Sequence, residues 1–165
     1  MSNKTKKEII RVEGNLKEIT TVSDDKGKIL HKIITPLMVE FKVRDMLQVL
    51  VGASLLAIPV GFTEETWILA ETLPVANVIA LVLISIGFIA AFVHYNYYRR
   101  HGNKHRKEFV KRVLSTYLVS FLVVAVLMIT IQKAPFATDW LLAFKRVAIV
   151  AFPASMSAAV ADMIK

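Results

Sequence analysis

Three carboxylates stand at the ends of long apolar stretches of the chain, where they could bind a cation. Glu64 and Glu65 follow the stretch VLVGASLLAIPVGFT, and Asp162 lies near the end of VAIVAFPASMSAAVADMIK. If Glu64 and Glu65 lie at the carboxyl end of a helix, the helix dipole and their mutual repulsion disfavour both charges, and a cation would relieve them. Carboxylate oxygens suit Ca²⁺, Mg²⁺ or Mn²⁺ better than softer metals. We therefore predict that Glu64 and Glu65 bind a metal ion or a monovalent cation, and that Asp162 binds a cation or lines a pore.

Each acid also has a simpler interpretation. Glu64 and Glu65 could be solvated charges just outside a membrane, and Asp162 could be an interfacial acid paired with Lys165 or with the basic stretch near residue 100. Lys145 and Arg146 follow closely after Trp140, so we expect them in an outer vestibule on the same side of the membrane as Glu64 and Glu65. No organic cofactor is expected.

The elements that would position these acids are four apolar runs. They cover residues 46–62, 76–93, 113–132 and 141–164, and 55% of the chain is hydrophobic. A helix needs about 20 mostly apolar residues to cross the hydrocarbon core of a bilayer. With flanking interfacial residues the predicted spans are 46–66, 76–98, 113–132 and 141–164. The fold class is therefore an all-α membrane protein with four transmembrane helices.

Lys and Arg residues are distributed very unevenly between the connections. Residues 1–44 contain ten of them and residues 95–112 contain seven, whereas residues 63–75 contain none and the third connection contains only Lys133. Short loops rich in Lys and Arg stay on the cytoplasmic side. We expect a multi-pass protein of the inner (cell) membrane with both termini in the cytoplasm. The basic loops would contact anionic lipid headgroups, and no recognised nucleic-acid-binding motif accompanies them.

Residues 1–43 form a polar cytoplasmic segment before the transmembrane domain of residues 44–165. Two β-prone stretches flank SDDKGK at residues 23–28, which favours a β-hairpin. Pro36 argues against a long unbroken second strand. The alternative is an amphipathic interfacial helix over residues 37–47.

Small residues recur at helical spacing in the first and fourth spans. Such strips allow close approach of helices in lipid, and they could instead line a pore. The residues in question are Ala53, Ala57 and Gly61 in the first span and Ser155 and Ala158 in the fourth.

The strings GASLLAIPVGFTEETW and FPASMSAAVAD resemble a family of small bacterial and archaeal integral membrane proteins known only as a domain of unknown function. The resemblance covers roughly residues 44–164. It implies a multi-span inner-membrane protein and assigns no activity and no functional residue.

We do not expect an enzyme, because the motifs HExxH, GxSxG and GxxxxGKS are absent and the chain has no Cys. The leading hypothesis is a homo-oligomeric cation pathway, or channel, with Glu64 and Glu65 at its outer mouth and Arg44 at its inner mouth. One alternative is a non-transporting membrane module that presents the cytoplasmic segment to a partner. The other is a small secondary transporter.

Overall fold

The computed structural model describes residues 4–12, 15–23, 29–36, 41–98 and 106–164. The chain divides into two compact units, Met1–Glu40 and Phe41–Lys165. This division lies close to the predicted boundary after residue 43. Each unit is described by itself.

The amino-terminal unit is a three-stranded antiparallel sheet in the order β1-β2-β3. The strands are β1 (Lys4–Val12), β2 (Asn15–Ser23) and β3 (Ile29–Pro36). The predicted hairpin corresponds to β2 and β3, although its turn lies outside the described residues, and β1 adds a third strand that we did not predict. β3 ends at Pro36, whose nitrogen carries no hydrogen for a ladder bond.

Ile19 in the central strand is buried, and it lies opposite Glu8 on β1 and Ile34 on β3. On the surface of β1, Lys6 and Glu8 form an ion pair with a distance of 2.6 Å between Nζ and Oε1. The hydrogen bond to Lys6 lowers the pKa of Glu8 and that to Glu8 raises the pKa of Lys6.

The second unit is a bundle of four long helices. They are α1 (Val43–Gly61), α3 (Val75–Val93), α4 (Arg106–Thr130) and α5 (Trp140–Ala161), and a π-helical turn at His94–Tyr98 continues α3. All four are long and apolar enough to cross a membrane. The prediction of four transmembrane helices is therefore confirmed. Of the alternative helix over residues 37–47, residues 37–40 lie outside the described residues, residues 41 and 42 are not helical, and residues 43–47 form the start of α1.

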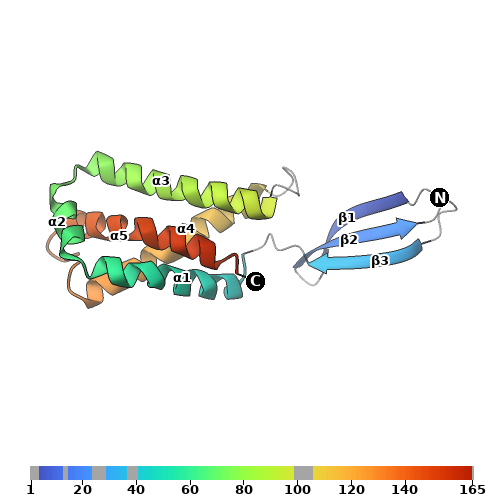
Figure 1. Ribbon diagram of the computed structural model, residues 1–165, viewed down its shortest axis with the longest axis horizontal. Coiled ribbons are helices and arrows are strands. Elements are labelled where there is room, and N and C mark those ends of the chain that lie inside the picture. Colours follow the sequence, from blue (N-terminus) through green and yellow to red (C-terminus); the bar gives the residue numbers. More distant parts are fainter. Residues whose placement is uncertain (1–3, 13–14, 24–28, 37–40, 99–105, 165) are drawn as a thin grey trace. The chain divides into compact units, whose positions relative to one another are not determined.

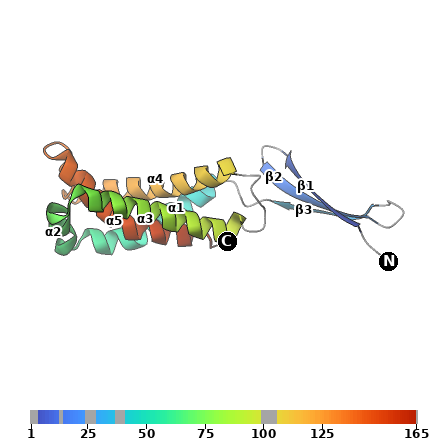
Figure 2. The same cartoon turned by 90° about the horizontal axis from the view of Figure 1, so that it is seen from above.

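A fifth helix, α2 (Glu64–Thr72), lies at one end of the bundle and packs on α5 (Figures 1 and 2). We call this end the Trp67 end. The opposite end, where α1 begins and α5 finishes, is called the Arg112 end. From one end to the other, α1 and α4 run in the same direction, and α3 and α5 run in the opposite direction.

The prediction of one continuous helix over residues 46–66 is wrong, because α1 ends at Gly61 and the chain turns into α2. Pro59 and Gly61 weaken the last turns of α1. The hydroxyl of Thr63 donates to the carbonyl of Val60 at 2.7 Å, and the indole nitrogen of Trp67 donates to the carbonyl of Gly61 at 2.9 Å. These bonds hold α2 against the end of α1.

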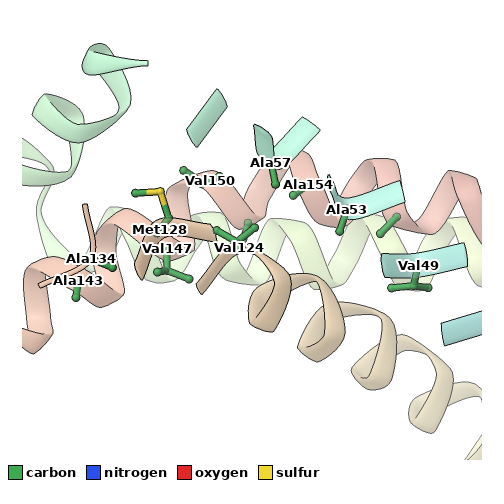
Figure 3. Packing of buried hydrophobic residues seen from close by; sticks show 12 residues of the cluster. Val49, Ala53, Ala57, Val124, Met128, Ala134, Ala143, Val147, Val150 and Ala154 are labelled. Carbon is green, nitrogen blue, oxygen red and sulfur yellow. The ribbon is translucent and has the colours of Figure 1, made fainter. Parts of the chain in front are cut away.

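The core of the bundle lies where α1, α4 and α5 meet (Figure 3). Ala53 and Ala57 on α1 and Ala154 and Ala158 on α5 are fully buried, and Val124 and Met128 of α4 pack against the same cluster. The backbones come so close that a Cβ added at Gly52 would lie 2.9 Å from the Cα of Ala158. Small side chains thus serve close helix packing in this bundle.

Candidate functional site

The face of α4 that points into the bundle changes character along its length. Every fourth residue from Arg112 to Met128 is buried, and the first three of these five are polar. The set is Arg112, Thr116, Ser120, Val124 and Met128. Because the interval of four residues keeps side chains on one face, this face brings a cation and two hydroxyls into the interior at the Arg112 end.

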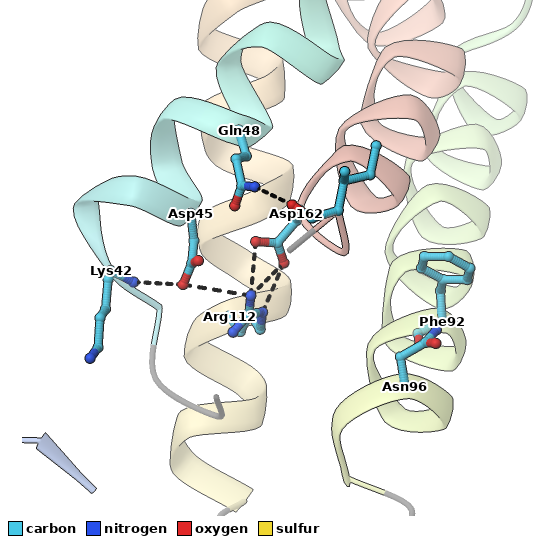
Figure 4. A network of polar contacts seen from close by, with 8 residues as sticks. Lys42, Asp45, Gln48, Phe92, Asn96, Arg112 and Asp162 are labelled. Carbon is cyan, nitrogen blue, oxygen red and sulfur yellow. Dashed lines mark hydrogen bonds and ion pairs between the residues drawn. The ribbon is translucent and has the colours of Figure 1, made fainter. Parts of the chain in front are cut away.

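Arg112 meets two carboxylates from two other helices (Figure 4). Its Nε donates to Asp162 Oδ2 at 2.9 Å, and its Nη2 donates to Asp162 Oδ1 at 2.8 Å and to Oδ2 at 2.7 Å. Asp45 Oδ2 lies 3.6 Å from the same Nη2. Arg112 and Asp162 have no exposed surface, and Asp45 is nearly as buried. We call these three residues the Arg112 cluster.

Asp45 is held in place by the start of its own helix. Its carboxylate accepts a hydrogen bond from the backbone N–H of Lys42 at 3.0 Å, which satisfies a donor at the amino terminus of α1. The ring of Phe41 lies over the guanidinium of Arg112, with 5.8 Å between Cζ and the ring centroid. The residues that lead into α1 therefore cover the Arg112 cluster on one side.

Paired charges are the expected form of buried ionisable groups, because an isolated charge in an apolar interior is very unfavourable. Asp162 caps the carboxyl end of α5, where the helix dipole disfavours a negative charge. Arg112 offsets both penalties through two parallel N–H···O bonds, the geometry that a guanidinium forms best with a carboxylate. Arg112, the last cation of the basic stretch of residues 95–112, thus supplies the counter-charge of Asp162.

The Trp67 end has a second set of polar contacts, which is more exposed. Arg146 on α5 donates to Glu71 Oε1 on α2 at 2.6 Å and to the backbone carbonyl of Lys133 at 2.9 Å. The ammonium of Lys133 lies over the ring of Trp67, 4.0 Å from its centroid. Lys145, the other cation that we predicted in the outer vestibule, is half-buried.

Glu64 and Glu65 lie in a different setting from the one on which their predicted role was based. They are exposed residues in the first turn of α2, not at the carboxyl end of α1. A helix amino terminus stabilises carboxylates by roughly 0.3–1 kcal/mol, so the expected conflict with the dipole does not arise. Among the described residues, no group of three or more His, Asp or Glu side chains could hold a metal ion. Metal binding at Glu64 and Glu65 stays a prediction, but the conflict with the helix dipole no longer supports it.

The other predicted site residues are distributed over the bundle. Ala53, Ala57, Gly61, Ser155 and Ala158 are all buried, which favours the packing role over pore lining within one chain. Arg44 is exposed, whereas its neighbour Asp45 points inward.

The sequence analysis did not identify Arg112 as the partner of Asp162 and Asp45, and it did not identify Glu71 as the partner of Arg146. We assigned Arg112 to a connection because it closes a run of seven cations. Its spacing of four and eight residues from Thr116 and Ser120 was the available signal for a position on the inner face of a helix.

The match to known proteins agrees with four apolar helices. A family model described as "Putative integral membrane protein (DUF2391)" matches residues 15–164. No curated protein and no solved structure matches the chain. Because the match spans most of the sequence, the chain belongs to this family of integral membrane proteins of unknown function.

Proposed function

We propose that the protein is a cation pathway in the inner membrane whose cytoplasmic end is held closed by the Arg112 cluster. The observation that carries the proposal is the complete burial of Arg112 against Asp162 and Asp45, on three helices, at one end of a membrane-spanning bundle. Ionisable groups inside membrane segments are rare and commonly mark ion pathways.

The energetics of the cluster fit a gate better than a simple stabilising contact. A buried ion pair gives little net stability, because desolvation of both charges consumes most of the Coulomb attraction. The two arms also differ, since Asp162 makes a bidentate contact and Asp45 lies 3.6 Å away. Separation of Asp45 from Arg112 would move α1 relative to α4 while α4 and α5 stay joined. In this proposal that movement opens the cytoplasmic end.

The outer acids and the assembly complete the proposal. Glu64 and Glu65 would concentrate cations at the outer mouth through their field. Subunits would associate through lipid-facing surfaces, such as the side of α3 that exposes Leu83 and Ile84. Exposed cations at the start of α4, Arg106 and Lys107, would contact anionic headgroups. The role is conduction rather than catalysis.

Cation flux into proteoliposomes tests the gate. Asp45→Asn keeps the shape of the side chain and removes its charge, so we expect faster flux than in the parent. If the lost contact is worth about 1.4 kcal/mol, the increase is about tenfold. Glu71→Gln removes one carboxylate at the opposite end and is the matched control, for which we expect no increase. Flux no greater than in empty liposomes for both the parent and Asp45→Asn would reject the proposal.

A separate measurement tests which end of the bundle faces the cytoplasm. The chain has no Cys, so single-cysteine variants can be labelled without background. Thr138 lies at the Trp67 end and Lys107 at the Arg112 end, and both are exposed. We expect an impermeant thiol reagent to label Thr138→Cys in intact cells, and Lys107→Cys only after the cells are broken. The reverse pattern would place the Arg112 cluster at the outer surface.

A non-transporting module is the second candidate, favoured by one observation on the sheet. Strand β3 exposes Ile29, Leu30, Ile33 and Ile34 by 62%, 51%, 54% and 56%. Apolar residues on an edge strand are a common template for pairing with another chain. A photo-crosslinker at Ile33 would then give a discrete adduct in cells, whereas one at Lys6 on the opposite edge strand would not. This outcome together with no flux would favour the module over the pathway.

A further inference from the structure

Two buried oxygen atoms near the Arg112 cluster have no hydrogen-bond partner within the described part of the chain. The first is Gln48 Oε1. The amide nitrogen of Gln48 donates to the backbone carbonyl of Ile164 at 2.6 Å, and this carbonyl can only accept. The orientation of the amide is therefore fixed, with Oε1 on the other side (Figure 4). The second atom is the hydroxyl oxygen of Thr116, whose side chain is fully buried.

The behaviour of Thr116 differs from that of the other buried hydroxyls of the bundle. Ser120 donates to the carbonyl of Thr116 at 2.7 Å, and Ser85 donates to the carbonyl of Leu81 at 2.9 Å. Both use the carbonyl four residues earlier, which is the usual choice for a hydroxyl inside a helix. Thr116 could reach the carbonyl of Arg112 in the same way and does not form this bond. Buried polar atoms are nearly always paired with protein or water, so its hydroxyl is placed for another partner.

The two oxygens lie at a similar depth on neighbouring helices. Gln48 follows Asp45 by three residues on α1, and Thr116 follows Arg112 by four residues on α4. Because α1 and α4 run in the same direction, the rise of 1.5 Å per residue places them roughly 4.5 Å and 6 Å deeper than the ion pair. The residues of α5 one turn before Asp162 are Ala158 and Ala159. Their small side chains let α1 and α5 approach closely here, where a Cβ added at Gly52 would lie 2.9 Å from the Cα of Ala158.

We infer that one buried water molecule joins Gln48 to Thr116 and extends the Arg112 cluster by one helical turn into the membrane. An amide oxygen only accepts, whereas a hydroxyl both donates and accepts. A water molecule can donate one hydrogen to Gln48 Oε1, accept the hydroxyl hydrogen of Thr116, and retain a second hydrogen for a further acceptor. Buried waters typically satisfy polar groups that protein atoms leave unpaired. This inference does not depend on the proposed conduction.

A double-mutant cycle on the full chain in detergent tests the shared water. Thr116→Val preserves the shape of the side chain and removes the hydroxyl, and Gln48→Met removes the amide. If one water joins the two, each single change lowers the midpoint of thermal unfolding by a few degrees, about 3 °C for a chain of this size. The double variant then loses clearly less than the two shifts added together. Thr116→Ser keeps the hydroxyl, so it should retain the stability of the parent, and Gln48→Met should lower the midpoint as much in the Thr116→Ser background as in the parent.

Two other results would overturn the inference. If no ligand holds the hydroxyl, Thr116→Val removes an unpaired buried group and raises the midpoint or leaves it unchanged. If the occupant is a monovalent cation, replacement of Na⁺ by choline lowers the midpoint of the parent and not that of Thr116→Val. A bridging water predicts the same midpoint in both salts.

Discussion

The two ends of the bundle each contain an ion pair between an arginine and a carboxylate, and the two pairs have nearly the same length. The shortest N···O distance is 2.7 Å for Arg112 and Asp162 and 2.6 Å for Arg146 and Glu71. Their surroundings differ, because the side chains of the first pair are 0% and 1% exposed and those of the second are 13% and 54% exposed. Burial, not distance, therefore decides what each pair contributes.

At the Trp67 end water can replace a lost partner, so the pair adjusts how α2 rests on α5 without deciding whether the bundle forms. At the Arg112 end the pair is buried, so water cannot readily take the place of a lost partner. Removal of one charge leaves the other in an apolar interior. The Arg112 end thus fixes α1, α4 and α5 to one another, while the Trp67 end holds a surface helix.

The largest effect is expected from Arg112→Gln, which leaves two buried carboxylates without their cation. We expect a loss of about 3–5 kcal/mol in the free energy of unfolding, as for other buried pairs that lose one partner. Denaturant unfolding in detergent measures the loss. The matched variant at the other end is Arg146→Gln, for which we expect a smaller loss. Equal losses at the two ends would refute the difference drawn from burial.

The sequence was sufficient for the parts of the fold that depend on local composition. A run of about 20 apolar residues predicts a spanning helix wherever it occurs, and all four spans were found in this way. The break between α1 and α2 was not found. Pro59 and Gly61 show that the helix is weak there, but the turn depends on the bond from Trp67 to the carbonyl of Gly61, which forms only in the folded chain.

The candidate site was predictable in part. Asp162 was identified because a carboxylate at the end of an apolar helix needs a partner, and the basic stretch that supplies the partner was named. Arg112 itself was not identified, because the seven cations in this stretch have the same charge. Of the four that the structure describes, Arg106, Lys107 and Lys111 are exposed, and the phase of α4 turns Arg112 inward. Asp45 was missed for the same reason, since Arg44 and Asp45 differ in the face of α1 that they occupy.

An intermediate effect is expected from alanine at Gly52, near the Arg112 end. Its added Cβ would overlap the Cβ of Ala161 and lie 2.9 Å from the Cα of Ala158, which cannot move aside independently. We expect a loss of about 1–3 kcal/mol from overpacking. Gly61, near the Trp67 end, faces Cδ2 of Leu127 at 3.2 Å and Sδ of Met128 at 3.5 Å, both in flexible side chains, so Gly61→Ala should lose less.

Gly87 on α3 provides the control for these two variants. A Cβ added there meets nothing within 4 Å. Gly87→Ala should therefore be neutral or stabilise the helix by up to about 1 kcal/mol. Thermal unfolding of the three variants measures the order. A loss at Gly87 as large as at Gly52 would mean that Gly87 contacts another subunit.

The smallest effect is expected from Glu71→Gln, which removes the exposed acid of the Trp67 end. The amide oxygen can still accept from Arg146, and the lost charge was largely in contact with water, so we expect a loss below about 1 kcal/mol. This loss should shrink further in 1 M salt, where charges are screened beyond about 3 Å. Asp162→Asn should be destabilising to the same degree at low and high salt, because its partner is inaccessible to ions. Unfolding curves of both variants at two salt concentrations make the comparison. A salt-dependent loss for Asp162→Asn would show that ions reach the Arg112 cluster and that its burial is incomplete in solution.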